Sequence, residues 1–174
     1  MIRSRKSQVQ HIFTYIIAVI VVGVVVYFGY QAIAGFMKQG CDVEKITFEK
    51  NLESFISKHK PFGKNRKEVL QAPCGYTQVC FVDKRQIGND SQGHSSSPFN
   101  AVFDGHSYPL ITSSIQDGVE ATVFLYDGRF SEPILNANIF VNQNNGFICV
   151  ENKNGKFSMM FSGKGLATEV SPGN

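Results

Sequence analysis

Residues 12–37 contain no charged side chain, and this uncharged run follows a short basic head. A helix of about 20 apolar residues crosses the roughly 30 Å hydrocarbon core of a bilayer, so the run is long enough to span a membrane. Residues 16–26 have no polar side chain, so a helix there has no solvated face. The sequence predicts a cytoplasmic basic head, a transmembrane helix and an extracytoplasmic domain over residues 1–11, 12–37 and 38–174.

Charges on either side of the run predict its orientation. Arg3, Arg5 and Lys6 precede it, whereas all 14 acidic residues follow it. Because three of the 17 basic residues lie in the head, the remainder of the chain carries 14 charges of each sign. The positive-inside rule places the N-terminus in the cytoplasm and the C-terminal domain outside, as a single-pass protein of the cell membrane. The lipid bilayer is the expected partner, and a formally neutral domain gives no indication of nucleic-acid binding.

A cleavable secretory signal is the alternative to a retained anchor. Ala32-Ile33-Ala34 before Gly35 is similar to a signal-peptidase site. The apolar region of a secretory signal is about 7–15 residues long, which is shorter than this run. We therefore expect the anchor to be retained.

Four cysteines all follow the apolar run, and an even number outside the cytoplasm predicts two disulfides. Cys80 and Cys149 each lie in the middle of an apolar, strand-like segment, so we expect them to be bridged across adjacent strands. Cys41 would then pair with Cys74. Spacing alone leaves a Cys74–Cys80 bridge open, and Cys80 and Cys149 could also be free buried thiols.

The outer part of the chain predicts one α+β domain, with a short amphipathic helix followed by a mostly antiparallel β-sheet. Asp42 is a candidate N-cap, and Phe48, Leu52, Phe55 and Ile56 follow at helical spacing until Pro61 and Gly63 stop the helix. Asn154-Gly155 predicts a two-residue hairpin turn, and Asp127-Gly128 a second turn. The expected strands cover residues 67–72, 77–83, 121–126, 133–141, 147–151, 156–161 and 166–170.

No catalytic or metal-binding motif occurs in the chain, so we expect a non-enzymatic protein without cofactor, metal or catalytic residues. Asp90, His94, Asp104 and His106 could form an acid–base set, but nothing pairs them with a nucleophile. Asn89-Asp90-Ser91 is a possible N-glycosylation site at Asn89. It lies in the polar segment 88–98, which we expect to be an exposed loop.

In the head, Ser7-Gln8-Val9-Gln10 follows Arg5-Lys6 and leads directly into the apolar helix. This pattern resembles archaeal class III signal sequences, which are of the type IV pilin-like kind. The resemblance implies processing between Ser7 and Gln8, and other pilin-like subunits or surface proteins as partners. Pilins usually carry glutamate at the fifth position after the cut, whereas this chain has Ile12.

Three hypotheses follow from these patterns. The first is a non-enzymatic, membrane-anchored surface component of the pilin-like type. The second is an anchored accessory module that binds a ligand or partner, with the segment 88–98 and the strand edges as its contact surface. The third is an anchored hydrolase, which would require titratable groups gathered in one pocket.

Overall fold

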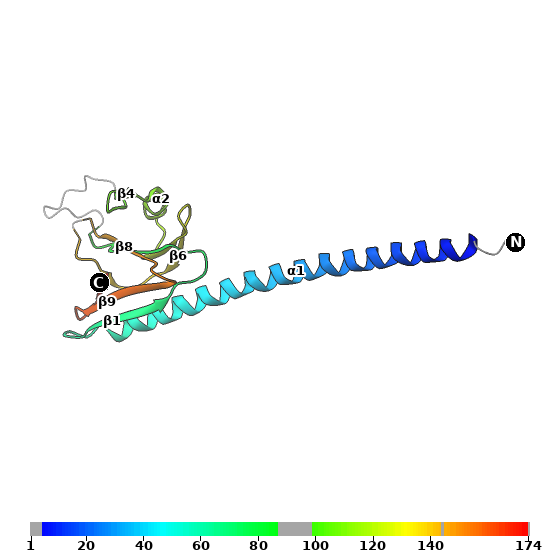
Figure 1. Cartoon of the computed structure of the whole chain (residues 1–174). Helices are drawn as coiled ribbons and strands as arrows, with labels where there is room; N and C mark the ends of the chain where they lie inside the picture. Colours follow the sequence, from blue (N-terminus) through cyan, green and yellow to red (C-terminus); the bar gives the residue numbers. More distant parts are fainter. Residues whose placement is uncertain (1–4, 87–98, 144, 174) are drawn as a thin grey trace. The chain divides into compact units, whose positions relative to one another are not determined.

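The computed structural model describes residues 5–86, 99–143 and 145–173, and Figure 1 shows its elements. The chain divides into two compact units, Met1–Val43 and Glu44–Asn174. Helix α1 (Arg5–Lys58) belongs to both units. Its residues up to Val43 lie in the first unit, and its residues from Glu44 lie in the second. The second unit continues with mainly antiparallel sheets, so the predicted α+β class is confirmed.

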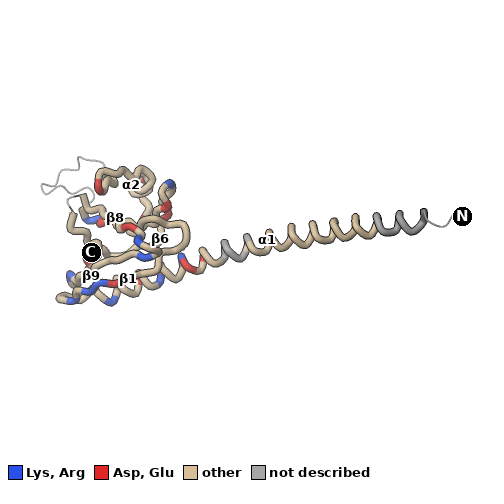
Figure 2. The backbone as a smooth tube through the Cα atoms, in the orientation of Figure 1, with Lys and Arg blue, Asp and Glu red and all other residues tan. Residues whose placement is uncertain are grey.

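Within the first unit, the segment Phe13–Ile33 of α1 has no charged side chain on any face. The segment Phe13–Ile33 has 21 residues and a mean hydropathy of 2.4, which is long and apolar enough to cross a membrane. Its described side chains are exposed, including Val19 at 72% and Val25 at 65%. In Figure 2 this stretch of α1 carries no charged residue between its grey segments. A helix of this composition is suited to surroundings of lipid or of other apolar helices.

The predicted break in α1 does not occur. The helix runs through Gly40 and Asp42 without interruption, so the prediction of a separate short helix capped by Asp42 is wrong. One glycine costs a helix only about 1 kcal/mol relative to alanine, too little to end it when the turns on both sides are helical. The amphipathic spacing is confirmed, because Phe48, Leu52 and Ile56 are at most 2% exposed.

Two four-stranded sheets form the second unit with α1. Sheet A has the order β1-β9-β10-β7, sheet B has the order β6-β5-β2-β8, and β3 and β4 form a separate pair. Only β7 and β10 are parallel among the described strand pairs. The elements after α1 are β1 (Asn65–Gln71), β2 (Gln78–Val82), β3 (Val102–Phe103), β4 (His106–Ser107), α2 (Pro109–Gln116), β5 (Val123–Tyr126), β6 (Ser131–Leu135), β7 (Ile139–Phe140), β8 (Phe147–Glu151), β9 (Lys156–Gly163) and β10 (Thr168–Pro172).

Sheet B is buried on both faces. Val79 and Phe81 of β2 belong to a first core shared with α1 and sheet A, whereas Cys80 and Val82 belong to a second core under α2. Alternate side chains of a strand point to opposite faces, so consecutive buried residues require a cover on each side. The first core contains the larger group of buried residues, and the second holds Ile111 of α2 against the disulfide-bearing face.

The Asn154-Gly155 turn joins two sheets instead of closing a hairpin. Both residues have positive φ, 54° and 76°, and Lys153 N donates to Lys156 O at 2.9 Å. The predicted turn geometry is therefore confirmed. Beyond this bridge β8 pairs in sheet B and β9 in sheet A. The turn reverses the chain between Lys153 and Lys156. Burial of the two cores determines that β8 pairs in sheet B and β9 in sheet A.

The expected strand over residues 133–141 is split between the sheets. Its first part lies in β6 of sheet B, and its last part forms β7 of sheet A. Thr122 stabilises the crossing, because the Ala137 N–H donates to Thr122 Oγ1 at 2.8 Å. The other expected strands correspond to β1, β2, β5, β8, β9 and β10, whereas β3, β4 and α2 were not predicted.

A buried carboxylate holds β7 near the end of β2. Asp83 is 1% exposed, and its oxygens accept from Arg85 Nε at 3.0 Å and from Arg85 Nη2 at 3.2 Å. The same guanidinium donates to the Ile139 carbonyl at 2.8 Å. A buried carboxylate is tolerated only when it is paired and hydrogen-bonded, so this contact fixes the sheets at their crossing.

Candidate functional site

The bridge between Cys80 and Cys149 lies beside the site, and Cys149 is part of its lining. The two residues are directly paired in the register of β2 and β8, with a Cα–Cα distance of 4.0 Å, and both are buried. This is the pairing expected from their mid-strand positions, and it excludes a Cys74–Cys80 bridge. Cys41 and Cys74 are also disulfide-bonded, and no described cysteine is free.

A cleft of about 600 Å³ opens beside this disulfide. Its floor follows a row across sheet B, because Gln78 pairs with Tyr126 on one side and with Glu151 on the other. The next row, Phe124, Cys80 and Cys149, lies deeper in the second core. The lining also includes Phe103, Asp104, His106, Ser107, Tyr108, Gly128, Val150, Lys153, Ser158, Pro172 and Gly173.

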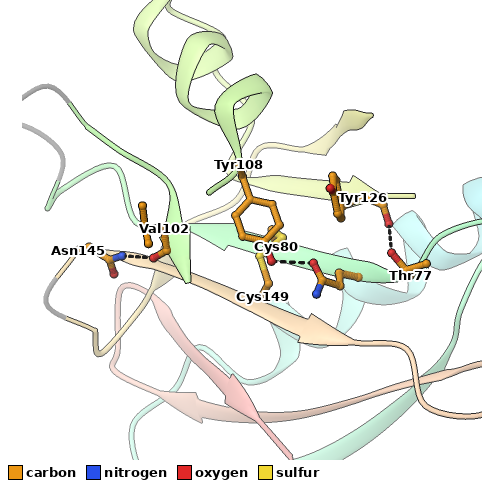
Figure 3. Close-up of a disulfide and its surroundings, with 8 residues drawn as sticks. Thr77, Cys80, Val102, Tyr108, Tyr126, Asn145 and Cys149 are labelled. Carbon is orange, nitrogen blue, oxygen red and sulfur yellow. Dashed lines mark hydrogen bonds between the residues drawn. A yellow bond between two sulfur atoms is a disulfide. The ribbon is translucent and has the colours of Figure 1, made fainter. Parts of the chain in front are cut away.

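Tyr108 lines the cleft, and Figure 3 shows its ring beside the Cys80–Cys149 bridge. Its hydroxyl donates to Gln78 Oε1 at 2.8 Å, and its ring lies edge-on to Tyr126 at 5.2 Å between centroids. Burial raises the pKa of the Tyr108 hydroxyl, its hydrogen bond with Gln78 opposes this, and Tyr126, Glu151 and Asp104 raise the pKa further. The hydroxyl therefore stays protonated as a donor at neutral pH.

The opposite rim comes from the β3–β4 hairpin. Asp104 and Gly105 both have positive φ, 50° and 76°, which is the conformation of a two-residue type I′ turn. Asn145 Nδ2 donates to the Val102 carbonyl at 2.6 Å and ties this hairpin to the chain before β8 (Figure 3). The Asp-Gly dipeptide was the available sequence signal for this hairpin, but two-residue strands are too short to show periodicity.

The rim residues differ from the floor in exposure and charge. Asp104, His106, Glu151 and Lys153 are exposed, so two carboxylates, one ammonium and one imidazole surround the opening. At the side formed by sheet A, Ser158 Oγ is buried and makes no hydrogen bond within the described structure. The cleft thus combines aromatic surface with polar groups that include both hydrogen-bond donors and acceptors.

The acid–base set considered from sequence is only partly assembled. Asp104 and His106 both line the cleft, whereas Asp90 and His94 lie outside the described residues. Across the described part of the chain, no three His, Cys, Asp or Glu side chains are grouped as a metal site. His59 has a packing role, since it is 3% exposed and its ring stacks on Phe161 at 5.9 Å between centroids.

The other sequence candidates do not belong to the cleft. Ser7 and Gln8 lie within α1 in the first unit. Asn89 and the segment 88–98, which was expected to be a contact surface, lie outside the described residues. Sequence reasoning missed the cleft itself, because its lining residues come from distant segments that only the two-sheet packing brings together.

The chain matches no protein-family model, no curated protein and no solved structure. The apolar surface of α1 and the lining of the cleft are therefore the observations that bear on function.

Proposed function

We propose that this protein is a single-pass, membrane-anchored surface component of the pilin-like type, with its second unit outside the cell and no enzymatic role. One observation carries the proposal. Helix α1 is uninterrupted from Arg5 to Lys58, is apolar and exposed over Phe13–Ile33, and becomes amphipathic where it enters the core of the second unit.

This division of α1 matches two environments. The exposed apolar surface needs lipid, or copies of the same helix, around it. Gly23 and Gly29 have open space where a Cβ would stand, so close approach of another helix is unobstructed there. The disulfides support an oxidising compartment for the second unit, because such bonds persist mainly outside the cytoplasm.

Two experiments on cells test the proposal. Protease added outside intact cells should digest the second unit and leave a membrane-held N-terminal fragment, and protection of the second unit would contradict the orientation. Mass spectrometry of the mature N-terminus should give Gln8 for pilin-like processing. A start at Met1 indicates a plain anchor, and a start at Gly35 indicates secretion and overturns the anchor.

Filament formation needs its own measurement. We expect fibres containing the protein to be recovered from sheared cells and to be lost when Val19 and Val22, both exposed on α1, are replaced by lysine. Those substitutions would also hinder insertion of α1 into a membrane. Ser54→Lys, at an exposed position of the amphipathic segment, therefore serves as a control for the added positive charge alone. Monomeric protein in mild detergent together with fibre-free cells would contradict assembly.

A second function is favoured by the cleft, namely that of an anchored module that binds a ligand. Ligand sites are concave, largely preformed, and combine apolar walls with a few placed polar groups. The cleft beside Tyr108 has these properties, and its volume of about 600 Å³ suits a small molecule or a segment of a larger one. Binding of any compound class in the cleft would support this function.

A further inference from the structure

We propose that the cleft beside the Cys80–Cys149 bridge binds a neutral, polyhydroxylated ring, that is, a saccharide. This inference rests on the binding-module function and names its ligand class.

Aromatic surface is the first requirement, and the cleft provides it. Phe103 and Tyr126 are only partly buried, so each leaves part of its ring facing solvent along the lining. Tyr108 holds Tyr126 edge-on at 5.2 Å, which fixes the ring position without a ligand. The apolar C–H face of a sugar ring packs on such surfaces, and prepositioned rings lower the ordering cost of binding.

The second requirement of a saccharide site is that it offers both hydrogen-bond donors and hydrogen-bond acceptors. Glu151 and Asp104 are acceptors, Lys153 is a donor, and the hydroxyl of Ser107 is both. Each sugar hydroxyl is also a donor and an acceptor, so a mixed set of groups satisfies it better than groups of one kind. These side chains belong to the β3–β4 hairpin on one side of the opening and to β8 and the following turn on the other.

Charge balance argues against strongly ionic ligands. Two carboxylates face the opening together with the Lys153 ammonium and the His106 imidazole. An anion would meet the carboxylates of Asp104 and Glu151, and a polycation would meet Lys153. A wholly apolar ligand would strip water from these charges without replacing their hydrogen bonds, which is costly. A neutral polar ligand avoids all three penalties.

Ser158 supplies an additional observation inside the cleft. Its Oγ atom is buried and makes no hydrogen bond to a described residue, although it belongs to the lining. Buried hydroxyls are nearly always hydrogen-bonded in folded proteins. Ser158 Oγ is thus a polar atom in the wall of the cleft that no described residue satisfies.

The test uses the full chain in lipid nanodiscs and saturation-transfer NMR. The probes are maltose, lactose and chitobiose as neutral disaccharides, spermidine as a cation and glucuronate as an anion. We expect transfer to at least one disaccharide, with a Kd of about 1 mM or tighter. Empty nanodiscs report lipid binding, and a chain variant with Phe130→Ala is the matched control, because Phe130 is 68% exposed and lies outside the lining.

Two variants locate the site. Ser107→Trp fills the opening from an exposed position, and Glu151→Ala removes an exposed acceptor, so neither removes a core side chain. Each should weaken disaccharide binding at least tenfold, whereas Phe130→Ala should leave it unchanged. Disaccharide binding that survives Ser107→Trp would place the site elsewhere and overturn the proposal.

The remaining outcomes separate the two proposals. If spermidine or glucuronate binds, and this binding is lost in Ser107→Trp while all disaccharides fail, the assignment of a neutral saccharide is overturned and the binding module stands. If no probe of any class binds, both the saccharide assignment and the binding-module function are overturned. The anchored surface role does not depend on either result.

Discussion

Loss of the Cys80–Cys149 bridge should remove a large part of the stability of the second unit. The bridge closes a chain segment with a sequence separation of 69 residues, and both sulfurs lie in the buried second core. In the chain-entropy description, a loop of this length restricts the unfolded state by about 4 kcal/mol. Domains of this size are typically stable by only about 5–15 kcal/mol, so the effect should be easily measured.

The comparison is best made within one protein. In a Cys41→Ala, Cys74→Ala background only the Cys80–Cys149 bridge remains, and its oxidised and reduced forms differ by one covalent bond while both sulfurs stay in place. Alanine variants of Cys80 and Cys149 would add a cavity cost to the entropy term. Using the reduced form therefore isolates the contribution of the cross-link.

Urea unfolding of the nanodisc-held chain, followed by tyrosine fluorescence and by pulse proteolysis, provides the measurement. With a denaturant slope of about 2 kcal/mol per molar urea, the midpoint of the reduced form should be about 2 M lower. If the two forms unfold within about 0.5 M of each other, chain restriction is not how this bridge contributes. Equal midpoints would also mean that the packing of Tyr108 and Phe124 holds the facing strands without a covalent link.

Three further predictions concern single contacts. A Cβ on Gly163 would stand 1.9 Å from the carbonyl oxygen of Pro61, so Gly163→Ala should force the backbones apart and destabilise the unit by at least about 2 kcal/mol in urea unfolding. The hydroxyl of Thr168 is buried and donates to a carbonyl in the last turn of α1 at 2.7 Å, so Thr168→Val should cost about 1–3 kcal/mol in the same assay, and an unchanged midpoint would contradict this. The hydrogen bonds from Lys45 and Tyr76 lower the pKa of Glu132, so this contact stabilises the fold above the ordinary glutamate pKa and is lost as pH falls through the lowered value. Lys45→Met should raise the pKa of Glu132 in a carbon-13 NMR titration, and an unmoved titration curve would refute the pairing.

Local patterns predicted several elements correctly because their causes are local. The 3.6-residue spacing of Phe48, Leu52 and Ile56 reflects which face of the helix is buried. The positive φ angles of Asn154 and Gly155 follow from the preferences of these two residues. The segment around Cys149 was recognised as a strand because it is apolar throughout, and it forms β8 with the predicted bounds.

Other features depend on partners that the sequence does not place. The separate short helix expected from Asp42 does not form, because the turns on both sides of that residue are helical and α1 continues through it. The expected strand over residues 133–141 divides because its first part pairs with β5 in sheet B, whereas Ile139 and Phe140 pair with β10 in sheet A. The β3–β4 hairpin is too short to show a period and is held by Asn145 from a distant segment.

By itself, the sequence determined that the chain has an apolar helix long enough to span a membrane and a separate α+β part with paired cysteines. Both depend on composition and short-range periodicity, which are properties of consecutive residues. Only the tertiary structure decided that sheet B is covered on both faces and that Tyr108, Tyr126, Glu151 and Ser158 line one cleft. Such a site arises from contacts between strands far apart in the chain, and these contacts are selected by burial of the two cores as a whole.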